Sequence, residues 1–265
     1  MEKNKFIFVC GLHRSGTTLV HRILKNHPYI SGLNDNGDIR DEEGQHHQTV
    51  YPCDEYFGIL KNCGALFGKY RIPVGVGRFA FDKNAHLTET SALATKENGE
   101  KLFRDWSKHW DLEKPFLIEK SPPNIIMTRF LQKIFPNSYF IVITRHPIAT
   151  SLASKKWKIF ETLPTLIRHW LEAHKIYNED KSHIKNVLEF RYEDFVCSPK
   201  EHLERIYKFL NIPYVEPKDI QIIRKINNKY YKTWNSLRYS LFKSYIIRKY
   251  EKEINKFNYS FYDLL

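Results

Sequence analysis

A short apolar run followed by a glycine turn and a helix start constrains this 265-residue chain more than any other feature. The run is FIFVC, residues 6–10, and the turn that follows is GLHRSGTT, residues 11–18. Gly11 and Gly16 stand five apart, as in the phosphate-binding pattern G-x-x-x-x-G-K-[ST], but Thr17 replaces the lysine. The stretch therefore predicts a strand, an anion-binding loop and a helix, with Arg14 as the positive charge of the loop.

Short apolar runs alternate with segments of helical period along most of the chain, which is typical of βαβ units around a parallel sheet. The predicted strands are residues 6–10, 116–120, 139–144 and 187–191. The predicted helices are residues 17–26, 124–135, 147–160 and 200–210. We expect one α/β domain over residues 1–265, with a P-loop-type parallel sheet flanked by helices and a helical, basic C-terminal segment.

Charge and composition indicate which classes of partner and which cellular compartment to expect. The formal net charge of +12 favours a polyanionic partner such as a nucleotide, a nucleic acid or a membrane surface. The basic residues after Lys218 are mixed with aromatic ones, a pattern that favours amphipathic helices with basic outer faces over a nucleic-acid surface. No apolar run suits a signal peptide or a membrane span, and no cysteine or histidine spacing suits a metal. We expect a cytoplasmic enzyme with no metal, no structural disulfide and no nucleic-acid partner.

Basic and aromatic side chains follow the predicted strands where an open α/β sheet binds its ligands. Lys120 ends the second strand, Arg145 follows the third and Tyr192 follows the fourth. Lys120 would reach the anion held by the first loop, and Arg145 would form a second anion site beside a helix N-terminus. Two separated anion sites predict one ligand with two separated phosphate groups, whereas an ATP enzyme gathers its phosphates at one loop and holds magnesium with an aspartate.

Three segments resemble the sulfotransferases that use 3′-phosphoadenosine 5′-phosphosulfate (PAPS). RSGTT resembles their phosphosulfate loop, TRHP their 3′-phosphate site, and RYEDFVCSPKEHLERIYKFLNIP a later strand and helix of the family. The loop is more similar to the tyrosylprotein and carbohydrate branches than to the cytosolic phenol and steroid branch. EGQHHQ resembles a segment of bacterial members.

The resemblance implies roles for individual residues. Those that match the phosphosulfate loop are Arg14, Ser15, Gly16, Thr17 and Thr18. Lys120 matches the lysine that touches the bridging oxygen, Arg145 would bind the 3′-phosphate, and Tyr192 the adenine edge. A family serine falls on Ala153, so we expect Ser151 or Ser154 to supply its hydroxyl.

The predicted reaction is a metal-independent, in-line transfer of the sulfuryl group from PAPS to a hydroxyl or, less favourably, an amine. Arg14 and Lys120 would neutralise the charge that grows on the leaving phosphate. Asp35, the match to the base of the tyrosylprotein branch, Glu43 and His46 are the candidate bases, since an acceptor hydroxyl must lose its proton.

Several alternatives stay open at this stage. The acceptor can be a sugar, a peptide tyrosine or a small polar metabolite, and the oligomeric state is not readable. The rival functions are a metal-dependent P-loop kinase or NTPase and a non-catalytic module that binds a nucleotide or a nucleic acid.

Overall fold

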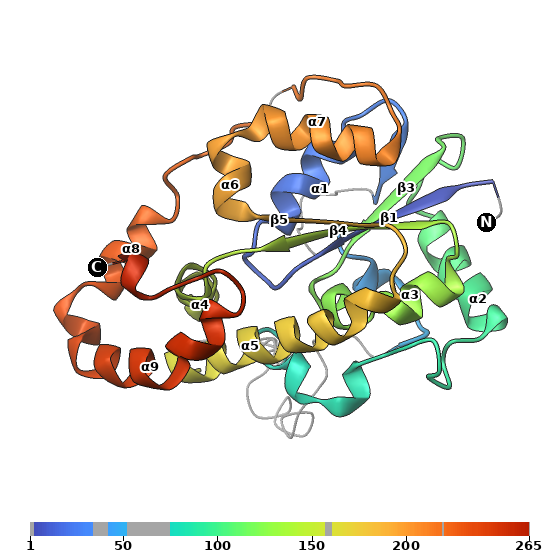
Figure 1. Cartoon of the computed structure of the whole chain (residues 1–265). Coiled ribbons are helices and arrows are strands. Elements are labelled where there is room, and N and C mark those ends of the chain that lie inside the picture. Colours follow the sequence, from blue (N-terminus) through green and yellow to red (C-terminus); the bar gives the residue numbers. More distant parts are fainter. Residues whose placement is uncertain (1–2, 34–41, 52–74, 157–160, 219, 265) are drawn as a thin grey trace, which may run out of the picture.

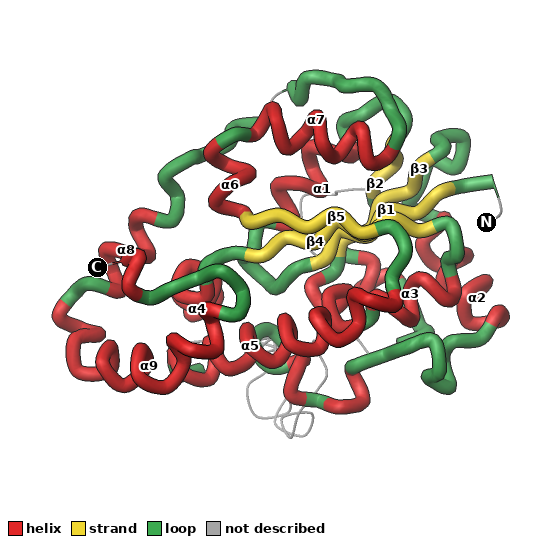
Figure 2. The backbone as a smooth tube through the Cα atoms, in the orientation of Figure 1, coloured by secondary structure: helices red, strands yellow, loops and turns green. Residues whose placement is uncertain are grey.

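The computed structural model describes residues 3–33, 42–51, 75–156, 161–218 and 220–264. They contain a parallel sheet of five strands in the order β2-β3-β1-β4-β5, covered by helices on both faces (Figures 1 and 2). The strands are β1 (Lys5–Cys10), β2 (Ile30–Gly32), β3 (Phe116–Lys120), β4 (Ser138–Thr144) and β5 (Val187–Arg191). The predicted α/β class and the parallel sheet are confirmed.

The helices form two layers, one on each side of the sheet (Figure 1). The first layer consists of α1 (Thr17–Lys25), α6 (Tyr192–Cys197) and α7 (Pro199–Leu210). The second consists of α2 (Lys96–Ser107), α3 (Thr128–Ile134), α4 (Pro147–Lys155) and α5 (Leu163–Asp180). Short 3₁₀ helices are η2 (Gly44–His47), η5 (Phe79–Phe81), η6 (Lys83–Ala85), η7 (Pro122–Ile126), η8 (Lys181–His183) and η9 (Tyr262–Leu264).

Strand β1 shows why a buried strand of this sheet appears in the sequence as an uninterrupted run of apolar residues. Phe6, Phe8 and Cys10 pack in the core beneath α2 to α5, whereas Ile7 and Val9 pack in the core beneath α1, α6 and α7. Successive residues of a strand point to opposite faces, so a strand covered on both sides needs apolar residues at every position. Burying each such large side chain stabilises the fold by about 1.5–3 kcal/mol.

The register of the strands brings the predicted site residues to one edge of the sheet. Val9 pairs with Lys120, Cys10 pairs with Val142, and Thr144 pairs with Arg191. The loop after β1 and the residues that end or follow β3, β4 and β5 therefore lie side by side.

The element boundaries differ from the predictions in several places. The helix predicted for residues 124–135 is η7 followed by α3, because Met127 has a non-helical φ of −131° between them. The helix that starts at Pro147 ends at Lys155, and residues 157–160 lie outside the described residues. Strand β2 was not predicted because its three residues, ISG, are too short to show a period, and α6 intervenes between β5 and α7.

The basic C-terminal part contains α8 (Asn228–Trp234) and α9 (Leu237–Asn255), which pack against α4 and α5 (Figure 1). Trp234, Ile246 and Ile254 are buried, whereas Arg248 and Lys252 are exposed. This arrangement confirms the predicted amphipathic helices. In the described part of the chain, every helix is too short or too polar to cross a bilayer.

Candidate active site

The loop between β1 and α1 has a backbone that only glycine allows at both bends. Gly11 has a φ of +153°, and a Cβ atom there would lie 2.5 Å from the carbonyl oxygen of Ile143. Gly16 has a φ of +107°, and its Cβ would lie 2.3 Å from Cδ2 of Tyr192. Arg14 also takes a left-handed φ of +68°. The two glycines therefore fix the loop tightly against β4 and against the Tyr192 ring.

The start of α1 is suited to bind an anion. Gly16 is the N-cap and has no side chain to accept a hydrogen bond from the first turn, which also lacks acidic residues. Thr17 and Thr18 are the first helical residues. The hydroxyl of Ser15 is buried and has no hydrogen-bond partner among the described residues. The N–H groups of the first turn and these hydroxyls form a set of donors at the positive end of the helix dipole.

A buried ion pair stands at the end of β3. Nζ of Lys120 donates to Oε1 of Glu43 at 2.8 Å, and the Lys120 side chain is fully buried. Nε2 of Gln45 donates to Oε2 of Glu43 at 2.7 Å, and Nε2 of His46 lies 3.5 Å from the same oxygen. Glu43, predicted only as one of three possible bases, is thus in direct contact with the predicted strand-end lysine.

The surroundings of Glu43 keep it ionised at neutral pH. Burial by itself raises the pKa of this carboxyl group, but the charge of Lys120, a hydrogen bond with His46 and the nearby His13 lower the pKa to about 2. A carboxylate with so low a pKa is a weak base while it is paired with Lys120, and it becomes a stronger one when an anion draws the lysine away.

Arg145 lies beside the loop, between β4 and the C-terminal segment. Its guanidinium stacks on Tyr192, 4.5 Å from the ring centroid, and lies 5.5 Å from that of Tyr230. Nη1 donates to the carbonyl oxygen of Arg14 at 2.5 Å, and Nε donates to Oδ1 of Asn227 at 2.9 Å. The predicted second anion site is therefore held by aromatic rings and joined to the first site through Arg14.

The N-terminus of α4 differs from the prediction that it would present free N–H groups to an anion. Nδ1 of His146 accepts the hydrogen bond of the Ile148 N–H at 3.2 Å, and the His146 N–H donates to Oε1 of Glu193 at 3.0 Å. Burial lowers the pKa of His146 to about 4, so its neutral ring can accept from Ile148. The expectation was wrong because a side-chain cap and a carboxylate from α6 occupy this helix end.

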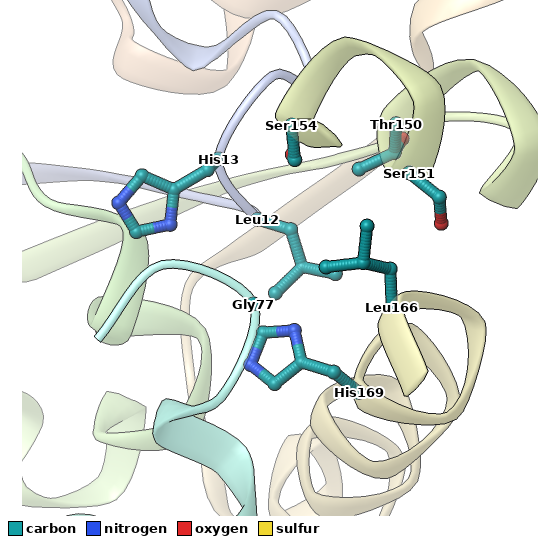
Figure 3. Close-up of a pocket in the computed structure, with 8 residues that line it drawn as sticks. All are labelled: Leu12, His13, Gly77, Thr150, Ser151, Ser154, Leu166 and His169. Atoms are coloured by element: carbon teal, nitrogen blue, oxygen red, sulfur yellow. The ribbon is translucent and has the colours of Figure 1, made fainter. Parts of the chain in front are cut away.

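Ser151 and Ser154 of α4 line a small cavity together with residues of the loop after β1 and of α5 (Figure 3). The cavity has a volume of about 10 Å³, which is room for about one water molecule, and His13 and His169 also line it. Among the described residues, neither serine hydrogen-bonds the Arg145 guanidinium, whose partners are Arg14 and Asn227. The role predicted for these serines at the second anion site stays a prediction.

A sequence profile of the sulfotransferase family matches residues 7–217. The chain belongs to the sulfotransferase family. It is 23% identical over 217 residues to protein-tyrosine sulfotransferase A of Caenorhabditis elegans, a match that covers 79% of this chain and 50% of that protein. It is 24% identical over 221 residues to the protein-tyrosine sulfotransferase of Drosophila melanogaster, a match that covers 78% of this chain and 38% of that protein. The chain thus spans half or less of the length of these two curated relatives.

Solved structures show the same fold. The sulfotransferase domain from the curacin biosynthetic pathway superposes with a TM-score of 0.57 at 16% identity, covering 97% of this chain and 98% of that one. The sulfotransferase domain of the Synechococcus PCC 7002 olefin synthase superposes with a TM-score of 0.57 at 19% identity, covering 97% of this chain and 96% of that one. Both likenesses support the sulfotransferase fold of the sheet and its helices.

The candidate site brings together most of the residues that the sequence singled out. Lys120, Glu43 and His46 lie together, and Arg145 and Tyr192 lie together beside the loop. Asp35, the ungapped match to the base of the tyrosylprotein branch, lies outside the described residues.

Two residues at the site escaped the sequence reasoning. Asn227 stands 82 positions from Arg145, and no local pattern connects them. Glu119 could have been found from the sequence, because it is an acidic residue within the apolar run FLIEK, and that strand is buried at every position.

Proposed function

We propose that this sulfotransferase moves the sulfuryl group of PAPS to an acceptor hydroxyl by in-line transfer and needs no metal ion. PAPS supplies the sulfuryl group and a phosphate leaving group, and adenosine 3′,5′-bisphosphate is the product. The observation that supports the proposal best is the buried Lys120–Glu43 pair at the end of β3, since it puts a cation and a base in one place. The family membership of the chain favours this reaction over a kinase or a non-catalytic module.

The residues of the first loop are suited to the 5′-phosphosulfate. The N–H groups of the first turn of α1, the hydroxyls of Thr17 and Thr18, and the Ser15 hydroxyl, which has no partner among the described residues, are donors for its oxygens. Arg14 adds positive charge. Arg145 is suited to bind the 3′-phosphate. The ring of Tyr192, which stacks against the Arg145 guanidinium, is suited to contact the adenine edge.

Lys120 and Glu43 would divide the chemical work. The ammonium of Lys120 stands at the end of β3, where it can neutralise charge on the leaving oxygen. As Lys120 turns to the donor, its attraction on Glu43 weakens and the carboxylate becomes a stronger base for the acceptor proton. The ion pair then keeps Glu43 weakly basic until the donor is bound.

A peptide tyrosine is the acceptor class to test first, because the curated relatives are named protein-tyrosine sulfotransferases. Sugars and small polar metabolites are the other two classes. The cytoplasmic location stays a prediction.

The test is sulfuryl transfer from PAPS to a tyrosine-containing peptide, measured with and without EDTA. We expect turnover to survive EDTA and Glu43→Gln to lower kcat by about a hundredfold or more, the usual contribution of a general base. Glu42→Gln is the matched control, because Glu42 is also buried and ion-paired but its partners are Arg22 and Lys25. Turnover that requires a metal, or a melting temperature raised by ATP with magnesium and not by adenosine 3′,5′-bisphosphate, would refute the proposal.

A further inference from the structure

A second buried carboxylate lies next to Lys120 in the chain. The side chain of Glu119 is fully buried and accepts three hydrogen bonds. Its donors are the Ser121 hydroxyl at 2.5 Å, Nδ2 of Asn124 at 2.5 Å and the Gly44 N–H at 2.8 Å. The last of these bonds joins β3 to the turn that carries Glu43.

The backbone of that turn is held from both sides. The Gly44 N–H donates to Glu119, and the Gly44 carbonyl oxygen accepts from Nε1 of Trp106 at 2.8 Å. The next N–H, that of Gln45, donates to Oγ of Ser121 at 3.0 Å. A Cβ atom at Gly44 would lie 2.6 Å from Cγ of Glu119, so the turn packs directly against this side chain.

The two neighbouring residues of β3 face opposite sides of the sheet. Glu119 contacts the Gly44 turn on the side of α2, where Trp106 lies, and Lys120 contacts Glu43 on the other side. The turn therefore straddles the end of the strand, with one residue bound on each side. A shift of Gly44 away from Glu119 would carry the adjacent Glu43 away from Lys120.

We propose that Glu119 is a positioning residue for sulfuryl transfer, which holds the turn so that the Glu43 carboxylate meets Lys120. The proposal rests on the proposed function for its kinetic consequence, whereas the placement of the turn can be measured without activity. A carboxylate is an expensive side chain to bury, and an apolar residue would suit a covered strand better. Burial raises the pKa of Glu119, and the hydrogen bonds from Ser121, Asn124 and Gly44 oppose that rise.

Glu119→Met removes both acceptor oxygens, and with them all three hydrogen bonds, at similar side-chain volume. We expect kcat with PAPS and a tyrosine peptide to fall by about tenfold or more, a loss equivalent to about 1.4 kcal/mol, with less than about a twofold change in affinity for adenosine 3′,5′-bisphosphate. The indole N–H resonance of Trp106, assigned by its loss in Trp106→Phe, should shift because its acceptor on Gly44 moves. Glu119→Gln is the conservative variant: its carbonyl oxygen can still accept from Gly44, and its amide can pair with a flipped Asn124, whose Oδ1 lacks a partner among the described residues.

Glu119→Gln should therefore keep the Trp106 resonance and a kcat within about threefold of wild type. Gly44→Ala is a second probe of the turn: its Cβ would lie 2.6 Å from Cγ of Glu119 and 2.8 Å from Cε2 of Trp106, so its readout is kcat, which should fall as in Glu119→Met. Wild-type kcat in both variants, with an unmoved Trp106 resonance in Glu119→Met, would overturn the positioning role. An equal loss of bisphosphate affinity and kcat would also overturn it, since that indicates general damage. An inactive wild type would overturn the proposed function alone, and the Trp106 resonance would still decide the placement of the turn.

Discussion

Replacing Lys120 with methionine leaves the Glu43 carboxylate buried without its main counter-charge. Removing one partner of a buried ion pair destabilises a protein by about 3–5 kcal/mol. The lowered pKa of Glu43 gives a comparison figure for Lys120, His46 and His13 acting together against burial, with Lys120 as the main lowering cause. Its fall from 4.5 to about 2 is worth about 3 kcal/mol at neutral pH, at about 1.36 kcal/mol per pH unit. Because Glu43 keeps the hydrogen bond from Gln45, we expect the free energy of unfolding to drop by about 3 kcal/mol, at the lower end of the range.

Urea denaturation at pH 7 measures this loss. The double variant Lys120→Met with Glu43→Gln removes the unpaired charge and should recover most of the stability. Lys25→Met is the control, since Lys25 is part-exposed and its partner Glu42 keeps a bond from Arg22, so its loss should stay below about 1 kcal/mol. The reasoning fails if Lys120→Met costs no more than Lys25→Met, or if the double variant is less stable than the single one.

Three further predictions follow from the contacts at the site. Gly16→Ala should weaken binding of adenosine 3′,5′-bisphosphate by about tenfold or more in calorimetry, because its methyl group overlaps the Tyr192 ring at a left-handed φ. Arg145→Ala should cause a similar loss, and an unchanged affinity would contradict the assignment of Arg145 to the 3′-phosphate. Folding lowers the pKa of Glu43, so its contribution to stability is present above pH 4.5 and is lost as the pH falls toward 2. Glu43→Gln should remove this acid-dependent part of unfolding measured by circular dichroism.

The sequence predicted the sheet well because β1, β3 and β4 are almost fully buried, on both faces. Such strands appear as continuous apolar runs, and β3 and β5 have the bounds that were expected. Strand β2 has three residues and lies at the edge of the sheet, so it left no periodic signal. The rule that ligands bind beyond the carboxyl ends of parallel strands correctly brought Lys120, Arg145 and Tyr192 to one edge.

Contacts between distant segments were beyond the reach of pattern reasoning. Residue types nominated Glu43 as a base, but only the folded turn shows that it bonds Lys120, 77 positions away. The same holds for Glu193, which caps α4 from α6 where an open helix end was expected. Periodicity reports which face of an element is buried and not which polar groups meet there.

The order of the strands separates two tasks within the molecule. The residues proposed to bind the donor lie in the loop after β1, at the end of β3, after β4 and at the start of α6, whereas the turn with Glu43 comes between β2 and α2 in the chain and bonds to the end of β3. A central strand such as β1 has a neighbouring strand on each side, whereas β2 at the edge of the sheet pairs with β3 alone. Under the proposed function, we therefore expect substitutions that alter acceptor choice to be tolerated more easily next to β2 than in the loops proposed to bind the donor.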